Sequence, residues 1–170
     1  MSPRANEQIQ WWVLGFSLPM QPAYTRVKIW RHLQSIGALA LGKNGVYVLP
    51  ARDNLLAGFE WILTEARAVG GDAVIFAATL VAGYDGEELR RLFQSERDSE
   101  YSTLAQEIVE LTAALSRRRG APPVAEASAS IGRLTERARS IGARDYFNAP
   151  ARAEVLSLLK HAESRLGETS

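Results

Sequence analysis

The sequence of 170 residues contains no cysteine and only two histidines. The absence of cysteine excludes disulfides, thiolate catalysis and cysteine-ligated zinc or iron–sulfur centres. His32 and His161 lie far apart, and neither belongs to the short helical spacings, His-x-x-x-His or His-Glu-x-x-His, with which histidines ligate zinc. The sequence therefore predicts no protein-bound metal and no cofactor.

Catalytic motifs are also absent. The apolar segment that starts at Trp11 ends in Phe16-Ser17-Leu18-Pro19, without the carboxylate that a metal-dependent nuclease needs at the end of a strand. Ser17 lacks the second glycine of a nucleophile elbow and has no candidate base nearby. The turn Gly42-Lys43-Asn44-Gly45 lacks the spacing and the following Ser/Thr of a phosphate-binding loop. These absences predict that the protein is not an enzyme.

Long hydrophobic runs are missing as well. The longest apolar stretches fall far below the roughly 20 residues that span a bilayer. The first ten residues lack the apolar core of a signal peptide. Hydrophobic residues still make up 46% of the chain, which is enough to bury a core. We expect a cytoplasmic protein with no membrane partner.

The first half of the chain alternates strand and helix patterns. Residues 11–18 are apolar on both faces, which is typical of a central strand. A helix follows as far as Gly37, and four of its residues are expected to face the sheet: Ile29, Trp30, Leu33 and Ile36. Two short strands, 38–41 and 46–49, flank Asn44-Gly45, the dipeptide most typical of a tight hairpin.

A second helix, from Asp53 or Asn54 to about Val69, and a fourth strand over 72–81 complete the order βαββαβ. This order predicts an α+β, ferredoxin-like module over residues 8–83. Two helices on one face of four strands leave the other face to be covered by the remaining chain or by a second subunit.

The second half of the chain has helical periodicity. Asp85 and Glu88 form a capping-box pattern at the start of a helical segment over 84–119, which is either one helix or two with a kink near Ser95–Ser99. Residues 120–129 are rich in proline and small side chains and predict a linker. Helices at about 130–141 and 149–166 form a last region, over residues 130–167.

Cationic side chains give the main indication of function. The net charge is only +1, but no carboxylate occurs between Glu7 and Arg52. We predict that six residues contact DNA phosphates: Arg26, Lys28, Arg31, Arg117, Arg118 and Arg119. The alternative is that these side chains form an ordinary solvated helix face.

A second set of residues suits a tetrahedral oxyanion. Arg31, Arg97 and Tyr101 are predicted to line a pocket between the ferredoxin-like module and the helical region, since the guanidinium fork matches oxyanions. The four tryptophans are more consistent with core packing than with a platform for bases. Among them, Trp11 is the one for which we expect exposure.

Several motifs together resemble the N-terminal domain of the ChrB family of chromate-resistance regulators. These are the strand ending in Ser17-Leu18-Pro19, Arg26-Val27, Trp30-Arg31, Ile36-Gly37-Ala38, residues 45–50, Phe59-Glu60-Trp61, Gly70-Gly71, residues 93–101, Arg144-Asp145-Tyr146-Phe147 and Pro150. The resemblance spans nearly the entire chain.

The resemblance implies a transcription factor that senses chromate and controls an adjacent efflux gene. Members of the family typically carry a second, C-terminal domain, which we do not expect within these 170 residues. The first module also resembles those of PaaX-type repressors and of the small CRISPR adaptation subunit, which commonly dimerise through their sheets. In the CRISPR relatives a metal-binding aspartate follows the first strand, near the position of Ser17 here, so nuclease activity is not carried over.

The sequence and the resemblance together predict a DNA-associated regulator that senses chromate or a similar oxyanion and forms a homodimer. Two alternatives stay open. One is a stand-alone oxyanion-binding or dimerisation module without DNA binding. The other, less favoured, is an enzyme: a degenerate metal-dependent nuclease or a chromate reductase.

Overall fold

The computed structural model describes residues 10–169, except residues 44 and 118. The chain divides into two compact units: an α/β unit that ends at Leu89 and a helical unit that begins at Arg90. The α/β unit contains β1 (Trp11–Ser17), α1 (Ala23–Ser35), β2 (Leu39–Leu41), β3 (Val46–Pro50), α2 (Asp53–Ala68) and β4 (Asp72–Ala78). The remaining helices are α3 (Gly86–Leu115), α4 (Val124–Ala143) and α5 (Ala151–Thr169), and the first turn of α3 belongs to the α/β unit.

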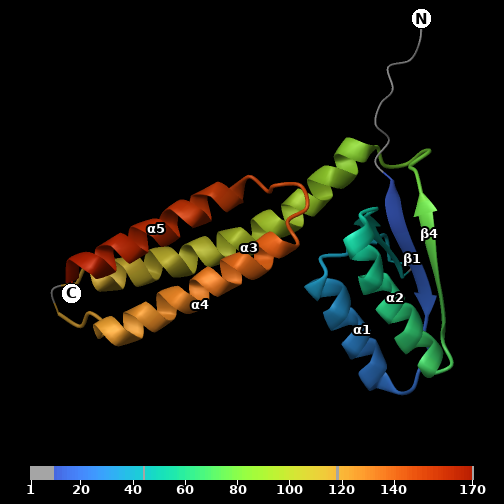
Figure 1. Cartoon of the computed structure of the whole chain (residues 1–170), viewed down its shortest axis with the longest axis horizontal. Helices are drawn as coiled ribbons and strands as arrows, with labels where there is room; N and C mark the ends of the chain where they lie inside the picture. The colour runs from blue at the N-terminus through green and yellow to red at the C-terminus, as the bar shows by residue number, and fades with distance from the viewer. Residues whose placement is uncertain (1–9, 44, 118, 170) are drawn as a thin grey trace, which may run out of the picture. The chain divides into compact units, whose positions relative to one another are not determined.

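The α/β unit confirms the predicted ferredoxin-like arrangement. Its four strands lie in the order β2-β3-β1-β4, and each neighbouring pair is antiparallel. Helix α2 packs on β1 and β4, and α1 packs beside α2 (Figure 1). The core between these layers includes Leu14 of β1, Leu33 of α1, and Phe59 and Ile62 of α2, all fully buried.

The hairpin between β2 and β3 is present, and Leu41 pairs with Val46. Gly42 and Gly45 both have positive φ, a conformation that glycine adopts without the strain of a side chain. Asn44, the other half of the predicted turn signature, lies outside the described residues.

Two tryptophans are placed differently from the prediction. Trp30 is 56% exposed and does not face the sheet, because residue 30 lies about 100° around the helix from the buried Ile29. Trp11 is only 1% exposed, although we expected it to be the accessible one. It belongs to the central strand, where Pro50 and Ala78 flank it on the two neighbouring strands.

The capping box at the start of α3 is confirmed. The Glu88 amide donates to Asp85 Oδ1 (2.7 Å), and the Asp85 amide donates to Glu88 Oε2 (2.8 Å). Of the two alternatives for the segment that follows, the structure has one continuous helix, which ends at Leu115.

The linker prediction over 120–129 is wrong for its second half, because α4 already begins at Val124. Pro123 immediately precedes the helix, and the small residues that follow include alanine, the best helix former. Ala127 is completely buried, so tertiary packing fixes this turn as helix. In the helical unit, α3, α4 and α5 share a core that includes Leu104, Ile108, Ile131 and Val155.

Candidate functional site

Helix α1 is held against α2 by two of its polar side chains. Lys28 Nζ forms an ion pair with Glu65 Oε2 at 2.7 Å and lies 5.1 Å from the centre of the Trp61 ring. His32 Nε2 lies 3.0 Å from the carbonyl oxygen of Gly58, and its ring packs against Trp61 at 4.2 Å between centroids. Lys28, a predicted DNA contact, is therefore half-buried and already paired.

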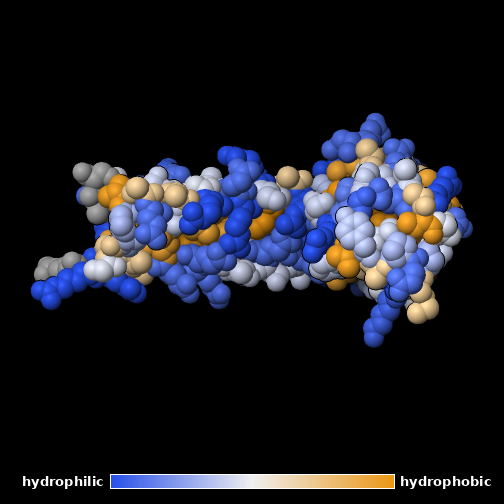
Figure 2. Space-filling view, turned by 90° about the horizontal axis from the view of Figure 1, so that it is seen from below, coloured by the Kyte–Doolittle hydropathy of each residue, from blue (hydrophilic) through white to orange (hydrophobic). Residues whose placement is uncertain are grey.

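The solvent-facing side of α1 carries both aromatic and cationic groups. We call this the α1 surface and define it as Tyr24, Arg26, Val27, Trp30 and Arg31, all of them exposed. Arg26 Nη2 contacts the Pro19 carbonyl oxygen at 3.4 Å, and Arg31 has no ion pair within the described residues. On the α/β unit, Figure 2 shows hydrophobic residues interspersed among hydrophilic ones. The α1 surface thus combines aromatic rings with two arginines that have no carboxylate partner among the described residues.

The other predicted DNA contacts follow the end of α3. Arg117 and Arg119 are exposed, and Arg118 lies outside the described residues. Helix α3 ends at Leu115, so these arginines come just after its last turn and not within it.

Arg97, predicted to bind an oxyanion, is buried in the helical unit with 6% exposure. Its Nη2 donates to Glu100 Oε1 at 2.8 Å. The same carboxylate accepts Arg144 Nη1 at 2.7 Å and Arg144 Nη2 at 2.6 Å. Burial lowers the pKa of Arg97, and its Nε is buried without a hydrogen-bond partner in the described part of the chain. Arg97 therefore belongs to an internal ion-pair group and does not face solvent.

Tyr101, the third predicted oxyanion ligand, is 1% exposed. Its hydroxyl donates to Asp145 Oδ2 at 3.4 Å. Burial, followed by the charge of Asp145, raises the pKa of Tyr101 to about 12. Arg97 and Tyr101 therefore both lie inside the helical unit, whereas Arg31 lies on the α/β unit.

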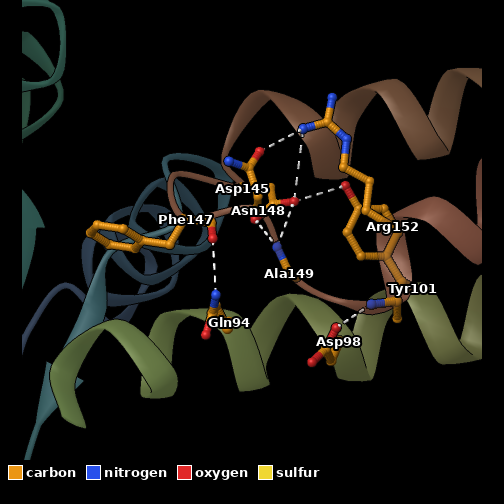
Figure 3. Close-up of polar contacts among 9 residues, drawn as sticks. Gln94, Asp98, Tyr101, Asp145, Phe147, Asn148, Ala149 and Arg152 are labelled. Carbon is orange, nitrogen blue, oxygen red and sulfur yellow. Dashed lines mark hydrogen bonds and ion pairs between the residues drawn. The ribbon is translucent and has the colours of Figure 1, made fainter. Parts of the chain in front are cut away.

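Asp145 is the centre of a buried polar cluster between α3 and the loop that joins α4 to α5 (Figure 3). Its two oxygens accept the Ala149 amide at 2.9 and 3.1 Å, and Arg152 lies 4.0 Å away. Together with the Tyr101 hydroxyl, these contacts hold the loop around the Asp145 carboxylate. We call the group Tyr101, Asp145, Ala149 and Arg152 the Asp145 cluster.

Helix α3 fixes the same loop at two further points. Gln94 Nε2 donates to the Phe147 carbonyl (2.9 Å), and Asp98 Oδ1 accepts the Ala151 amide at the start of α5 (2.8 Å). Residues 94, 98 and 101 share one face of the helix, as their spacing requires. The sequence analysis did not assign a role to Gln94 or Asp98, although their spacing was visible in the sequence, nor to Asp145, which is distant in the chain.

A shallow groove lies between α3 and α4, beside two ion pairs. Arg144 pairs with Glu100, and Arg137 pairs with Glu107 through its Nη1. The hydrogen bond between the latter two lowers the pKa of Glu107 and raises that of Arg137. The groove has a volume of about 280 Å³ and is lined by Glu100, Thr103, Arg137, Ser140, Ile141 and Arg144. Sequence reasoning did not single out Arg137 or Arg144 as ligand contacts.

The described residues contain no group of three or more His, Asp or Glu side chains arranged to hold a metal ion. Within the same residues, no helix is long and apolar enough to cross a membrane.

Comparison with known proteins gives a consistent result. The family model described as "Protein ChrB, N-terminal" matches residues 26–170. Protein ChrB of Cupriavidus metallidurans (strain ATCC 43123 / DSM 2839 / NBRC 102507 / CH34) is 30% identical over 112 residues, which cover 66% of this chain and 33% of that protein. The matched region is thus about a third of that relative's length. No solved structure matches the chain significantly.

Proposed function

The chain belongs to the family of ChrB N-terminal domains, and we propose that it is a DNA-associated regulator of chromate resistance that contacts DNA through the α1 surface. The observation that carries this proposal is that Arg26 and Arg31 lie on the same exposed helix surface as Tyr24 and Trp30, and that this helix contains no carboxylate. Arg117 and Arg119 are the proposed supplementary phosphate contacts.

The physical argument starts from the charge of the DNA backbone. Arginines without a carboxylate partner can neutralise phosphates and release counterions, which supplies most of the sequence-independent affinity. Tyr24 and Trp30 add flat rings that can pack on sugars or bases. Lys28 and His32 hold α1 on α2, so the exposed side chains are presented by a fixed helix.

Fluorescence anisotropy with a labelled duplex tests this proposal. The duplex comes from the region upstream of the chain's own gene, and a scrambled duplex of equal length serves as reference. We expect the double variant Arg26→Ala/Arg31→Ala to weaken binding to both duplexes and to reduce the salt slope of log K by about 2. Arg67→Ala is the matched control, since Arg67 is an exposed arginine on α2. Equal affinities for the double variant and the control would contradict the proposal.

A homodimer is the proposed assembly. Val74 and Phe76 lie on the same face of β4, an edge strand, and both are exposed. A second copy of the chain would cover these apolar side chains. Analytical ultracentrifugation tests this: Phe76→Ser should shift the equilibrium towards monomer. Leu156→Ser, an equally exposed leucine on α5, should leave it unchanged, and a wild-type monomer at all concentrations would contradict the assembly.

Chromate or a similar tetrahedral oxyanion is the proposed input of the regulator. Arg31 is exposed on the α/β unit and has no ion pair among the described residues. Arg97 and Tyr101 are engaged with Glu100 and Asp145, so an oxyanion site in the helical unit would use other arginines. An anisotropy titration of the DNA complex with chromate tests the input: dissociation by chromate at constant ionic strength supports it, and unchanged binding contradicts it.

A further inference from the structure

The groove between α3 and α4 has walls suited to an anion. Two guanidinium groups and one carboxylate line it, and Glu107 pairs with Arg137 beside it. Behind Glu100 lies a third guanidinium, that of Arg97, which shares the same carboxylate. Burial is the largest cause of the lowered pKa of Arg97; the charge of Glu100 opposes it, and the charge of Arg144 adds to it. Guanidinium groups and carboxylates thus lie close together along this wall.

The guanidinium groups retain hydrogen-bond donors that the protein does not use. An arginine has five N–H donors. Arg137 gives one of them to Glu107, and within the described residues it makes no other hydrogen bond. Arg144 directs Nη1 and Nη2 at Glu100, and each of these nitrogens carries a second hydrogen. Both arginines can therefore bind an anion without giving up their ion pairs.

One hydroxyl group in the groove is a further hydrogen-bond donor. Along α4, Ser140 lies between Arg137 and Arg144, and its hydroxyl has no partner among the described residues. The hydroxyl of Thr103, on the facing helix, already donates to the Ser99 carbonyl at 3.1 Å. The available donors are therefore the two guanidinium groups and the Ser140 hydroxyl, beside the apolar side chain of Ile141.

The size of the groove restricts the ligand. A volume of about 280 Å³ falls below the range of about 300–1,000 Å³ typical of sites for drug-sized molecules. A compact anion with several oxygens and two charges matches both the volume and the number of donors.

We infer that the groove lined by Arg137, Ser140 and Arg144 is a binding site for a small tetrahedral dianion. This inference rests on the proposed function, in which an oxyanion is the signal. It places the oxyanion site on α4 instead of at Arg31, Arg97 and Tyr101. Each guanidinium forms charge-assisted hydrogen bonds with the ligand, and these bonds are about twice as strong as neutral ones.

Isothermal titration calorimetry on the full chain tests the site, with sulfate and molybdate as tetrahedral dianions. Succinate, a carboxylate dianion, and sodium chloride at matched ionic strength are the comparison ligands. We expect sulfate and molybdate to bind with one-to-one stoichiometry and succinate to bind at least about tenfold more weakly. Tighter binding of succinate, or an equal response to chloride, would overturn the assignment.

Three variants locate the site. Arg137→Gln should weaken molybdate binding about tenfold, the effect of losing one charge-assisted contact. Ser140→Leu should abolish binding by filling the groove while it leaves both ion pairs in place. Arg139→Gln is the control, because Arg139 is exposed on the same helix and pairs only with Glu136 in the described structure. If Arg137→Gln and Ser140→Leu bind molybdate as tightly as Arg139→Gln, the ion is not in this groove.

The same variants separate this inference from the DNA proposal. In the absence of oxyanion, Ser140→Leu should bind the duplex with wild-type affinity, because it leaves α1 unchanged. If the chain binds DNA but not molybdate, the proposed anion site is wrong and the DNA proposal is unaffected.

Discussion

The two units of this protein use arginine in opposite ways. On the α/β unit, Arg26 and Arg31 are exposed and have no carboxylate partner within the described residues. In the helical unit, Arg97, Arg137 and Arg144 all pair with glutamates of α3. Arg31 and Arg97 have the same predicted role, yet Arg31 is exposed without an ion pair among the described residues and Arg97 is buried beside Glu100. For these two residues the difference is burial beside a carboxylate, which depends on the fold.

The difference has an energetic consequence. Removing one member of a buried ion pair strands the other, which costs several kcal/mol. An exposed arginine without a partner contributes little to stability and keeps its donors for a ligand. Removing a buried, paired arginine should therefore lower stability, whereas removing an exposed arginine should lower binding and leave stability nearly unchanged.

The largest effect is expected for Arg97→Ala. It removes a buried guanidinium from Glu100, and we expect a loss of about 3 kcal/mol in the free energy of unfolding. Urea denaturation followed by circular dichroism measures it. Arg31→Ala is the comparison and should change stability by less than about 1 kcal/mol. If the two variants lose the same stability, the contrast between the units is wrong.

A somewhat smaller effect is expected for Asp145→Asn. The variant replaces the carboxylate whose oxygens accept the Ala149 amide and the Tyr101 hydroxyl by a neutral amide with one acceptor oxygen, which should cost about 2 kcal/mol. Glu136→Gln is the control, since Glu136 forms an exposed ion pair with Arg139 and should lose at most about 0.5 kcal/mol. Thermal unfolding of both variants ranks them, and a larger loss for Glu136→Gln would contradict the place of Asp145 at the centre of its cluster.

The smallest effect concerns Tyr101 and pH. Its pKa is raised to about 12, so between pH 10 and 12 the unfolded chain loses the phenolic proton while the folded chain keeps it. The contribution of this group to stability is thus complete below pH 10 and is lost as pH rises towards 12. Tyr101→Phe should lower stability at neutral pH by about 1 kcal/mol and flatten the alkaline decline.

Phenolate absorbance provides the direct measurement. Of the five tyrosines, one should ionise about two pH units after an ordinary phenol, and Tyr101→Phe should remove that late step. A late step that persists in the variant would show that another tyrosine is the buried one.

Local patterns were enough to predict the fold of the α/β unit. Short apolar strand segments, the hairpin glycines and the capping box of Asp85 and Glu88 all act over a few residues, and the structure contains each of them. The exposure of Trp30 was missed because an apolar stripe on a helix has edges, and its width depends on what packs against it. The early start of α4 was missed because the burial of Ala127 depends on neighbouring helices.

The candidate sites were less predictable. Glu100 and Arg144 are 44 residues apart, as are Tyr101 and Asp145, and nothing local to either position indicates its partner. The cationic face of α1 was visible as a segment without carboxylates. The pairing of Lys28 with Glu65 was not, because it joins two helices.

Amide chemical-shift mapping of the labelled chain during titration with duplex DNA tests the central claim most directly. The account predicts that the largest changes occur in α1, over residues 23–35, and that they disappear in Arg26→Ala/Arg31→Ala. Changes confined to residues 90–169, with α1 unaffected, would contradict it.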